Sequence, residues 1–199
     1  MKKATMQVLL ASGFVVMMTA CGNNTGGAGS GSDSTGMDAK KEAKAQNDST
    51  FDTSGVKKDA SFAVDVADAG MLEVQLGKLA ATNASSARVK DFGKQMVTDH
   101  SKANDELTAL AKTKGIALPA TLSDKSQKIY NDLSGKMGAD FDKAYMDAQV
   151  DGHKDVVDML QKESDKGEDA DIKAWAQGKL PTIQHHLDMA KQIKDGLKK

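Results

Sequence analysis

Apolar residues spaced three and four positions apart from Asp59 to the C-terminus constrain this chain more than any other feature. This spacing places them on one face of an α-helix, the face that packs against a core. Aromatic residues make up only 4% of the chain, whereas residues with straight side chains, which lose little rotamer freedom in a helix, are common. The sequence therefore predicts an all-α domain over residues 59–199.

Breaks in the apolar pattern divide this region into four long helices. Ser85 or Ser86 is predicted to cap the second helix, and Gly115 is predicted to end it. A loop of about two residues then makes the first two helices antiparallel neighbours. The third helix is predicted over residues 139–166, and the fourth begins near Asp169.

The connection between the second and third helices is long. It holds Pro119 and a short amphipathic segment with Leu122, Ile129 and Leu133. Partly helical, it reaches about 55 Å, more than the roughly 40 Å length of one long helix. The sequence thus predicts a ferritin-like four-helix bundle with a short extra helix in the central connection, and an up-down-up-down bundle is the alternative.

Small residues repeat every seven positions on the first predicted helix, at Ala63, Gly70, Gly77 and Ala84. Glycine inside a helix costs about 1 kcal/mol relative to alanine. This cost is explained if another helix backbone packs closely against the small residues. We therefore expect a close helix–helix contact along this strip.

The N-terminus has the features of an export signal. Lys2 and Lys3 precede an apolar stretch over residues 8–20, which is shorter than the roughly 20 residues of a membrane-spanning helix. Residues 1–20 are therefore predicted to be a signal peptide. The following Cys21 is the only cysteine of the chain, and the run Met18-Thr19-Ala20-Cys21 resembles the lipobox of bacterial lipoproteins.

Cys21 is accordingly the expected site of lipidation and the first mature residue, and a buried core cysteine is the alternative. Acyl chains on it would anchor the protein to a membrane, because each buried methylene contributes about 0.8 kcal/mol. Residues 21–58 are low in complexity and are predicted to be a lipidated cysteine followed by a disordered linker, with a reach of about 33 Å. A transient helix over residues 39–45 is the alternative.

Charge excludes one class of partner. The chain has 27 Lys and Arg against 28 Asp and Glu, so no basic excess is available for a phosphate backbone. We expect no nucleic-acid partner. A nucleotide enzyme is not supported either, because the sequence has no glycine-rich phosphate loop preceded by a strand.

The four histidines of the chain all fall near the middle of predicted long helices. His100, His153 and His186 occupy core-facing positions, as does Glu73 on the first helix. Counting residues from the helix ends at 1.5 Å each places these four side chains at a similar depth. The sequence therefore predicts a buried polar layer of one carboxylate and three imidazoles.

Two interpretations of this layer are open. It is either a hydrogen-bonded layer, in which Glu73 pairs with His100, or a metal site for Zn, Cu or Fe, which neutral imidazoles bind well. His185 is expected to face solvent. Asp99, next to His100, is expected to face solvent, and orienting an imidazole ring is the alternative. Met96 and Met189 are expected to fill the core rather than to bind copper.

A ferritin-type di-iron site is not predicted. Such sites take a Glu from each of two helices and a Glu-x-x-His motif from each of the other two. Glu73 is the only core-facing Glu on the predicted helices, and the sequence contains no Glu-x-x-His. The fold alone carries no evidence for iron chemistry.

Four sets of residues carry a family resemblance. They are Gly70-Met71-Leu72-Glu73-Val74-Gln75-Leu76-Gly77, Phe92 with Met96-Val97-Thr98-Asp99-His100, Phe141-Asp142 and Tyr145 with His153, and Leu180-Pro181 with His186-Leu187. With them, residues 59–195 resemble the ferritin-like bacterial envelope family catalogued as domain of unknown function 4142, whose members are often labelled predicted outer membrane proteins. The resemblance implies a ferritin-like bundle, an envelope location and family polar positions at Glu73, His100, His153 and His186, but no activity.

The combined expectation is a lipid-anchored envelope protein, attached to the outer membrane and facing the periplasm. A non-enzymatic bundle for interaction or stress protection is the first functional hypothesis. A metal-binding bundle that uses the Glu and His layer is the alternative. If the protein is an enzyme, a metal-dependent oxidase or hydrolase is the remaining class, and this is the least favoured of the three hypotheses.

Overall fold

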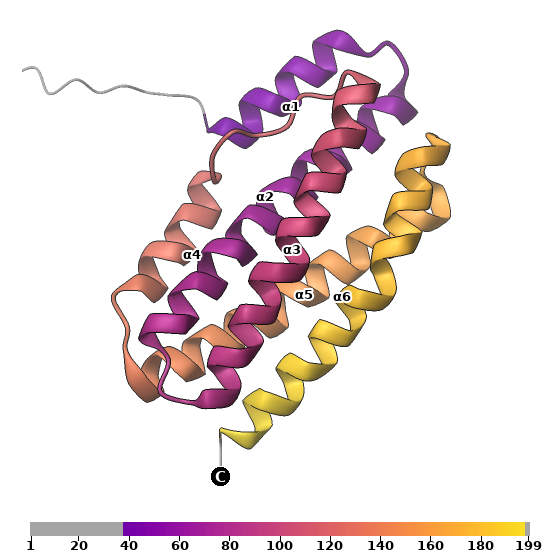
Figure 1. The fold of residues 1–199 in the computed structure, drawn as a ribbon. Coiled ribbons are helices and arrows are strands. Elements are labelled where there is room, and N and C mark those ends of the chain that lie inside the picture. The colour runs from indigo at the N-terminus through magenta and orange to yellow at the C-terminus, as the bar shows by residue number, and fades with distance from the viewer. Residues whose placement is uncertain (1–37, 198–199) are drawn as a thin grey trace, which may run out of the picture. The chain divides into compact units, whose positions relative to one another are not determined.

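The computed structural model describes residues 38–197, which form six α-helices and no β-strand (Figure 1). The helices are α1 (Ala39–Thr50), α2 (Ser54–Asn83), α3 (Ala87–Lys114), α4 (Asp124–Ser134), α5 (Gly138–Lys166) and α6 (Ala170–Gly196). The prediction of an all-α bundle with a short extra helix in the central connection is confirmed. The predicted signal peptide, Cys21 and the linker up to residue 37 lie outside the described residues.

The long helices are connected by a crossover. Helix α2 packs on α3 and α5, and α6 packs on α5 and α3. Ala84 at the end of α2 pairs with Gly138 at the start of α5, so α3 and α5 begin at the same end of the bundle. The chain returns to that end through α4, which lies along α2 (Figure 1). This is the ferritin-like arrangement and not the up-down-up-down alternative.

Helices α2 and α3 approach closely at two glycines. A Cβ atom on Gly77 would lie 2.6 Å from the Gly93 carbonyl oxygen, and one on Gly93 would lie 2.6 Å from the Ala80 Cβ. Neither position has room for a side chain. The small-residue strip on α2 thus meets a neighbouring backbone, as its sequence predicts.

The prediction of a disordered linker is wrong for residues 39–58. Helix α1 forms there, and α2 begins at Ser54 instead of residue 59. The buried Asn47 side chain donates to the Ala117 carbonyl at 2.9 Å and accepts from the Ala117 N–H at 2.8 Å. Lys40 and Lys44 also pair with the α2 residue Asp65. These contacts to distant parts of the chain stabilise a segment whose own composition is polar.

Three buried aspartates hold helix starts in place. Asp68 of α2 accepts hydrogen bonds from the Ser123 N–H, the Ser123 hydroxyl and the Ser126 hydroxyl at the start of α4. Asp59 of α2 accepts from two backbone N–H groups, those of residues 168 and 169, at the start of α6. Each carboxylate therefore satisfies backbone donors that a helix leaves free at its N-terminus.

Asp142 of α5 has the same role at the start of α3. It accepts from the backbone N–H groups of Ser85 and Ser86 and from the Ser85 hydroxyl. Ser86 occupies the N-cap position, but its own side chain makes no capping hydrogen bond. The predicted N-cap position is therefore correct, but the Asp142 carboxylate and not the serine side chain supplies the oxygen that accepts hydrogen bonds at this helix start.

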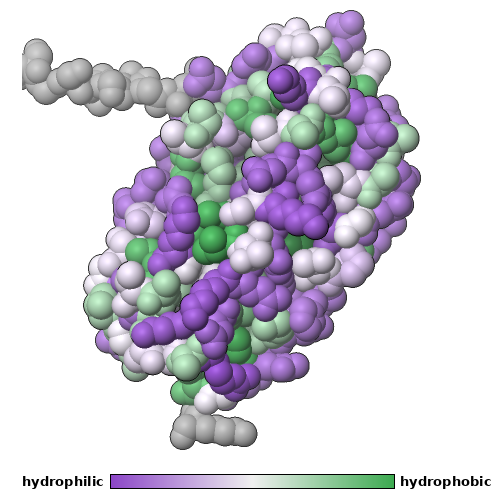
Figure 2. Space-filling view, viewed as in Figure 1, coloured by the Kyte–Doolittle hydropathy of each residue, from purple (hydrophilic) through white to green (hydrophobic). Residues whose placement is uncertain are grey.

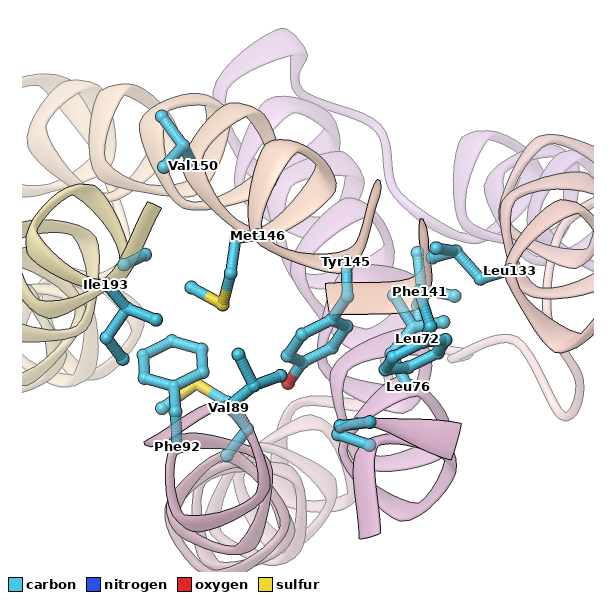
Figure 3. Packing of buried hydrophobic residues seen from close by; sticks show 14 of the residues in the cluster. Leu72, Leu76, Val89, Phe92, Leu133, Phe141, Tyr145, Met146, Val150 and Ile193 are labelled. Atoms are coloured by element: carbon cyan, nitrogen blue, oxygen red, sulfur yellow. The ribbon is translucent and has the colours of Figure 1, made fainter. Parts of the chain in front are cut away.

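The hydrophobic core has two clusters of buried residues, one on each side of the histidine positions. The first takes residues 72–84 of α2, 89–96 of α3, 141–150 of α5 and 187–193 of α6. The second takes earlier residues of α2 and α6 and later residues of α3 and α5. Figure 3 shows the first cluster, where Phe92, Tyr145, Met146 and Ile193 point toward one another between the helices.

The surface is mostly polar. Among residues 38–197, the large hydrophobic side chains that are exposed are Met137 and Leu197, at 63% and 37%. Hydrophilic residues cover most of the face in Figure 2, with hydrophobic residues in small areas between them. Within the described range, none of the helices combines the length and the hydropathy needed to cross a membrane.

Candidate metal centre

His100 of α3, His153 of α5 and His186 of α6 meet in the interior of the bundle. Their ring centroids are 5.6 Å (100–153), 5.5 Å (100–186) and 5.6 Å (153–186) apart. One nitrogen from each ring lies within 4.8 Å of the corresponding nitrogens of the other two. All three residues are buried, with exposed fractions of 5%, 1% and 0%. The helical periodicity places them here because each occupies a core-facing position at the same level.

The His153 ring is oriented by its own helix. Its Nδ1 lies 2.9 Å from the backbone carbonyl oxygen of Gln149. A carbonyl oxygen only accepts hydrogen bonds, so Nδ1 must donate and carries the proton. When the ring carries this single proton, its Nε2 atom holds the lone pair, and Nε2 is buried without a hydrogen-bond partner among residues 38–197.

The His186 ring is oriented from α3. Its Nε2 lies 2.8 Å from the Asp99 Oδ2, and a carboxylate accepts, so Nε2 donates. The Nδ1 atom is buried, and the described part of the chain offers it no hydrogen bond. Asp99 therefore does not simply face solvent, as its sequence position suggests. Its side chain is 34% exposed and fixes the tautomer of a buried ring.

His100 completes the cluster with its Nε2, which likewise has no partner in the described structure. Burial lowers the pKa of His100 well below its usual value, and the neighbouring His153 and His186 lower this pKa further. Burial also lowers the pKa of His186, although the hydrogen bond with Asp99 opposes this shift. These two rings are accordingly neutral at pH 7.

Glu73 of α2 lies at the same level but outside the three-histidine cluster. Its Oε2 accepts a 2.6 Å hydrogen bond from the Gln149 Nε2, and its Oε1 lies 3.9 Å from the His153 Nδ1. The predicted pairing of Glu73 with His100 is therefore wrong, because the carboxylate faces α5 and not α3. Burial raises the pKa of Glu73, whereas His153 and Gln149 act to lower it.

Gln149 is the functional residue that the sequence analysis missed. It binds Glu73 through its side chain and His153 through its carbonyl oxygen. Its core-facing position, four residues before His153, is the sequence feature that marks it. A polar amide in such a position needs a buried partner, and Glu73 is that partner.

The other residues near the layer have structural positions. His185 is exposed, and Met96 is fully buried in the first core cluster, with the partly buried Met189 packed against it. Asp142 caps α3, as described above. These three placements of His185, Met96 and Met189 agree with the sequence-based expectations.

The cluster has the dimensions of a tetrahedral metal site. Nitrogens at the corners of a triangle with 4.8 Å sides lie about 2.8 Å from its centre, against about 2.0–2.1 Å for a Zn–N bond. In a tetrahedral site the ion lies out of the plane of the three nitrogens, so each ring needs an inward shift of up to about 0.9 Å, which a side-chain rotation supplies. A ferritin-type di-iron centre does not fit, because the histidine cluster within residues 38–197 includes no carboxylate.

The fold and the cluster define a class of protein: a ferritin-like helical bundle with three buried histidines at its middle. The chain belongs to the family described as Domain of unknown function (DUF4142), whose model matches residues 41–193. The match begins within α1, so the family domain includes the helix that was predicted to be linker. Comparisons with curated proteins and with solved structures found no match.

Proposed function

We propose that this protein binds one transition-metal ion (zinc, copper or iron) through His100, His153 and His186. Two observations together carry this proposal: one nitrogen of each buried ring lies within 4.8 Å of a nitrogen of each of the other two, and each ring has one buried nitrogen without a hydrogen-bond partner in the described chain. Buried polar atoms are nearly always paired, so three adjacent exceptions need an explanation. A metal ion accepts all three lone pairs at once.

The alternative, a hydrogen-bonded layer without metal, has too few donors for the three rings. His153 uses its N–H on the Gln149 carbonyl, and His186 uses its N–H on Asp99. A neutral His100 with its proton on Nε2 offers one donor, which can satisfy one of the other two rings but not both, and burial and two neighbouring imidazoles disfavour a second proton on this ring. The metal-bound state therefore satisfies this layer better than hydrogen bonding does.

The surrounding groups have the arrangement that metal-bound histidines require. A ligating imidazole usually donates its second N–H to a carboxylate or a carbonyl, which raises the basicity of the ring. Asp99 and the Gln149 carbonyl are those acceptors for His186 and His153. Asp99 and Glu73 also place two carboxylates near the ion, which offset the charge of a divalent cation.

Titration calorimetry of the full chain, purified without chelator and freed of metal, tests the proposal. We expect one Zn²⁺ or Cu²⁺ per chain, and we expect His186→Ala to weaken binding by more than about 100-fold, because a ligand is lost. His185→Ala, an exposed neighbour on the same helix, is the matched control and should bind as the unmodified chain does. Circular dichroism checks that each variant remains helical.

Two outcomes would overturn the metal site. One is the absence of stoichiometric binding by a folded, metal-free chain. The other is equal weakening by His185→Ala and His186→Ala, which would mean that surface histidines bind the ion.

We further infer that the bundle is held at the bacterial cell envelope by lipid on Cys21. The apolar stretch before Cys21 and the lipobox-like residues support this inference. Replacing Cys21 with Ser should move the protein from the membrane fraction to the soluble fraction. Unchanged fractionation would contradict the anchor. An interaction or stress-protection role without catalysis stays a prediction.

A further inference from the structure

We propose that the metal keeps a fourth coordination position, which opens on a small cavity and takes water, hydroxide or another small anion. This inference rests on the proposed metal site and adds to it the class of ligand that the bound ion exchanges. A tetrahedral ion with three protein ligands needs a fourth ligand. The structure shows on which side of the histidine layer there is room for one.

The cavity is the next layer of the bundle and has His100 in its wall. Each of the four long helices contributes a residue one turn away from the polar layer. These residues are Gly70, three before Glu73; Ala103, three after His100; Val156, three after His153; and Ile183, three before His186. The cavity therefore lies directly against the cluster along the bundle axis.

The opposite side of the layer is filled. Met96 and Met146 are fully buried there, and the Phe92 ring lies 6.3 Å from the His153 ring. Figure 3 shows Phe92 and Met146 facing each other with Tyr145 beside them. An incoming ligand has no space on this side, so the fourth position faces the cavity.

The volume of the cavity sets the size of the ligand. The cavity has a volume of about 20 Å³, which is enough for one water molecule, because a buried water needs at least about 10–15 Å³. Most of its wall is apolar, so a large polar substrate does not fit. Water, hydroxide or a small linear anion bound end-on is the matching class.

Hydrogen-bond donors in the wall favour an anionic ligand. Trp175 lines the cavity, and its buried Nε1–H has no acceptor among the described residues. Lys179 also lines it, with its ammonium 6.0 Å from the Trp175 ring centre and paired with Glu106. Its side chain is 23% exposed, so it stands at the solvent side. We assign Trp175 and Lys179 as the donor and the charge that favour an anion in this cavity.

Azide titration of the full chain loaded with copper(II) tests this inference. Azide should displace the water on copper and give a new charge-transfer absorption band together with a changed electron paramagnetic resonance spectrum. Trp175→Phe, which keeps an aromatic ring but removes the N–H, should weaken azide binding by about fivefold or more without changing the copper affinity. Ala103→Leu, which fills the cavity, should abolish the azide response while copper still binds, and His185→Ala is the control.

The outcomes separate this inference from the metal site itself. Stoichiometric copper binding with no spectral response to azide leaves the metal site standing and overturns the open position. Equal azide affinity in the unmodified chain, Trp175→Phe and Ala103→Leu places the ligand elsewhere and also overturns it. Failure of the unmodified chain to bind copper overturns the proposed function, and this inference with it.

Discussion

The aspartates and the histidines in the interior of this bundle are buried to a similar extent, but they differ in their hydrogen bonding. Asp68 accepts three hydrogen bonds from Ser123 and Ser126, and Asp142 accepts three from Ser85 and Ser86. Each histidine of the cluster instead leaves one buried nitrogen unpaired within the described chain. The aspartates therefore position the helix starts, whereas the unpaired histidine nitrogens are the feature on which the proposed metal site rests.

The largest effect is expected from breaking an aspartate cap. Asp142→Ala removes three hydrogen bonds and leaves two backbone N–H groups without their acceptor, so the free energy of unfolding should fall by about 3 kcal/mol. Urea denaturation measures it, and the exposed Asp155→Ala on the same helix should change stability by less than about 0.5 kcal/mol. Metal affinity should stay unchanged in the folded variant. A stable Asp142→Ala would show that the cap is not structural.

The next effect tests Asp99, the carboxylate that accepts a hydrogen bond from a ring of the cluster. Asp99→Asn replaces the charged acceptor of His186 with an amide, so zinc affinity should fall by about 10–100-fold with little change in stability. The exposed Asp105→Asn on the same helix is the matched control for calorimetry. If both variants bind zinc equally well, Asp99 has no influence on the ion.

Removing a histidine of the cluster should have a smaller effect on the stability of the metal-free protein than Asp142→Ala, and in the opposite direction. His100→Met replaces a buried imidazole, one nitrogen of which lacks a partner in the described structure, with an apolar side chain. The metal-free variant should be as stable as the unmodified chain or more stable by about 1 kcal/mol, while losing metal binding. A loss of several kcal/mol would place His100 in the same structural class as Asp142.

The gain in stability of metal-free His100→Met over the unmodified chain should be larger at pH 5.5 than at pH 8. The pKa of His100 in the folded state lies well below its usual value of 6.5. The unfolded chain therefore takes up the proton first, and the unmodified protein loses stability as the pH falls below about 6.5. His100→Met removes that loss, which thermal melts at the two pH values detect.

The smallest effect is expected at Glu163, near the C-terminal end of α5. Its carboxyl group lies beside Asp59, which accepts hydrogen bonds at the start of α6. Burial, the charge of Asp59 and a hydrogen bond to it raise the pKa of Glu163 to about 7. The folded state holds this proton more tightly than the unfolded state, so stability is lost as the pH rises from about 4.5 to 7. Glu163→Gln mimics the protonated form and should raise Tm at pH 8 by about 2–4 °C but not at pH 5. Glu168→Gln, on an exposed neighbour, should raise Tm at neither pH.

The four long helices were predictable because their apolar period is local and strong. The histidines, too, are placed together by their positions on core-facing stripes at equal depth. Helix α1 was not predictable, because its buried Asn47 bonds to Ala117, seventy positions away. The partner of Glu73 was also mispredicted, since depth along a helix does not say which neighbour a side chain faces. For the same reason, the sequence did not decide between the two alternatives for Asp99, and the structure shows the one that orients a ring.

X-ray absorption spectroscopy of the full chain loaded with one equivalent of zinc tests the central claim most directly. The cluster predicts three imidazole nitrogens at about 2.0–2.1 Å from the ion and one further light atom. Loss of one imidazole from this shell in His153→Ala, with His185→Ala unchanged, would agree with the account. A shell made of oxygen atoms alone, or an unchanged spectrum in His153→Ala, would contradict it.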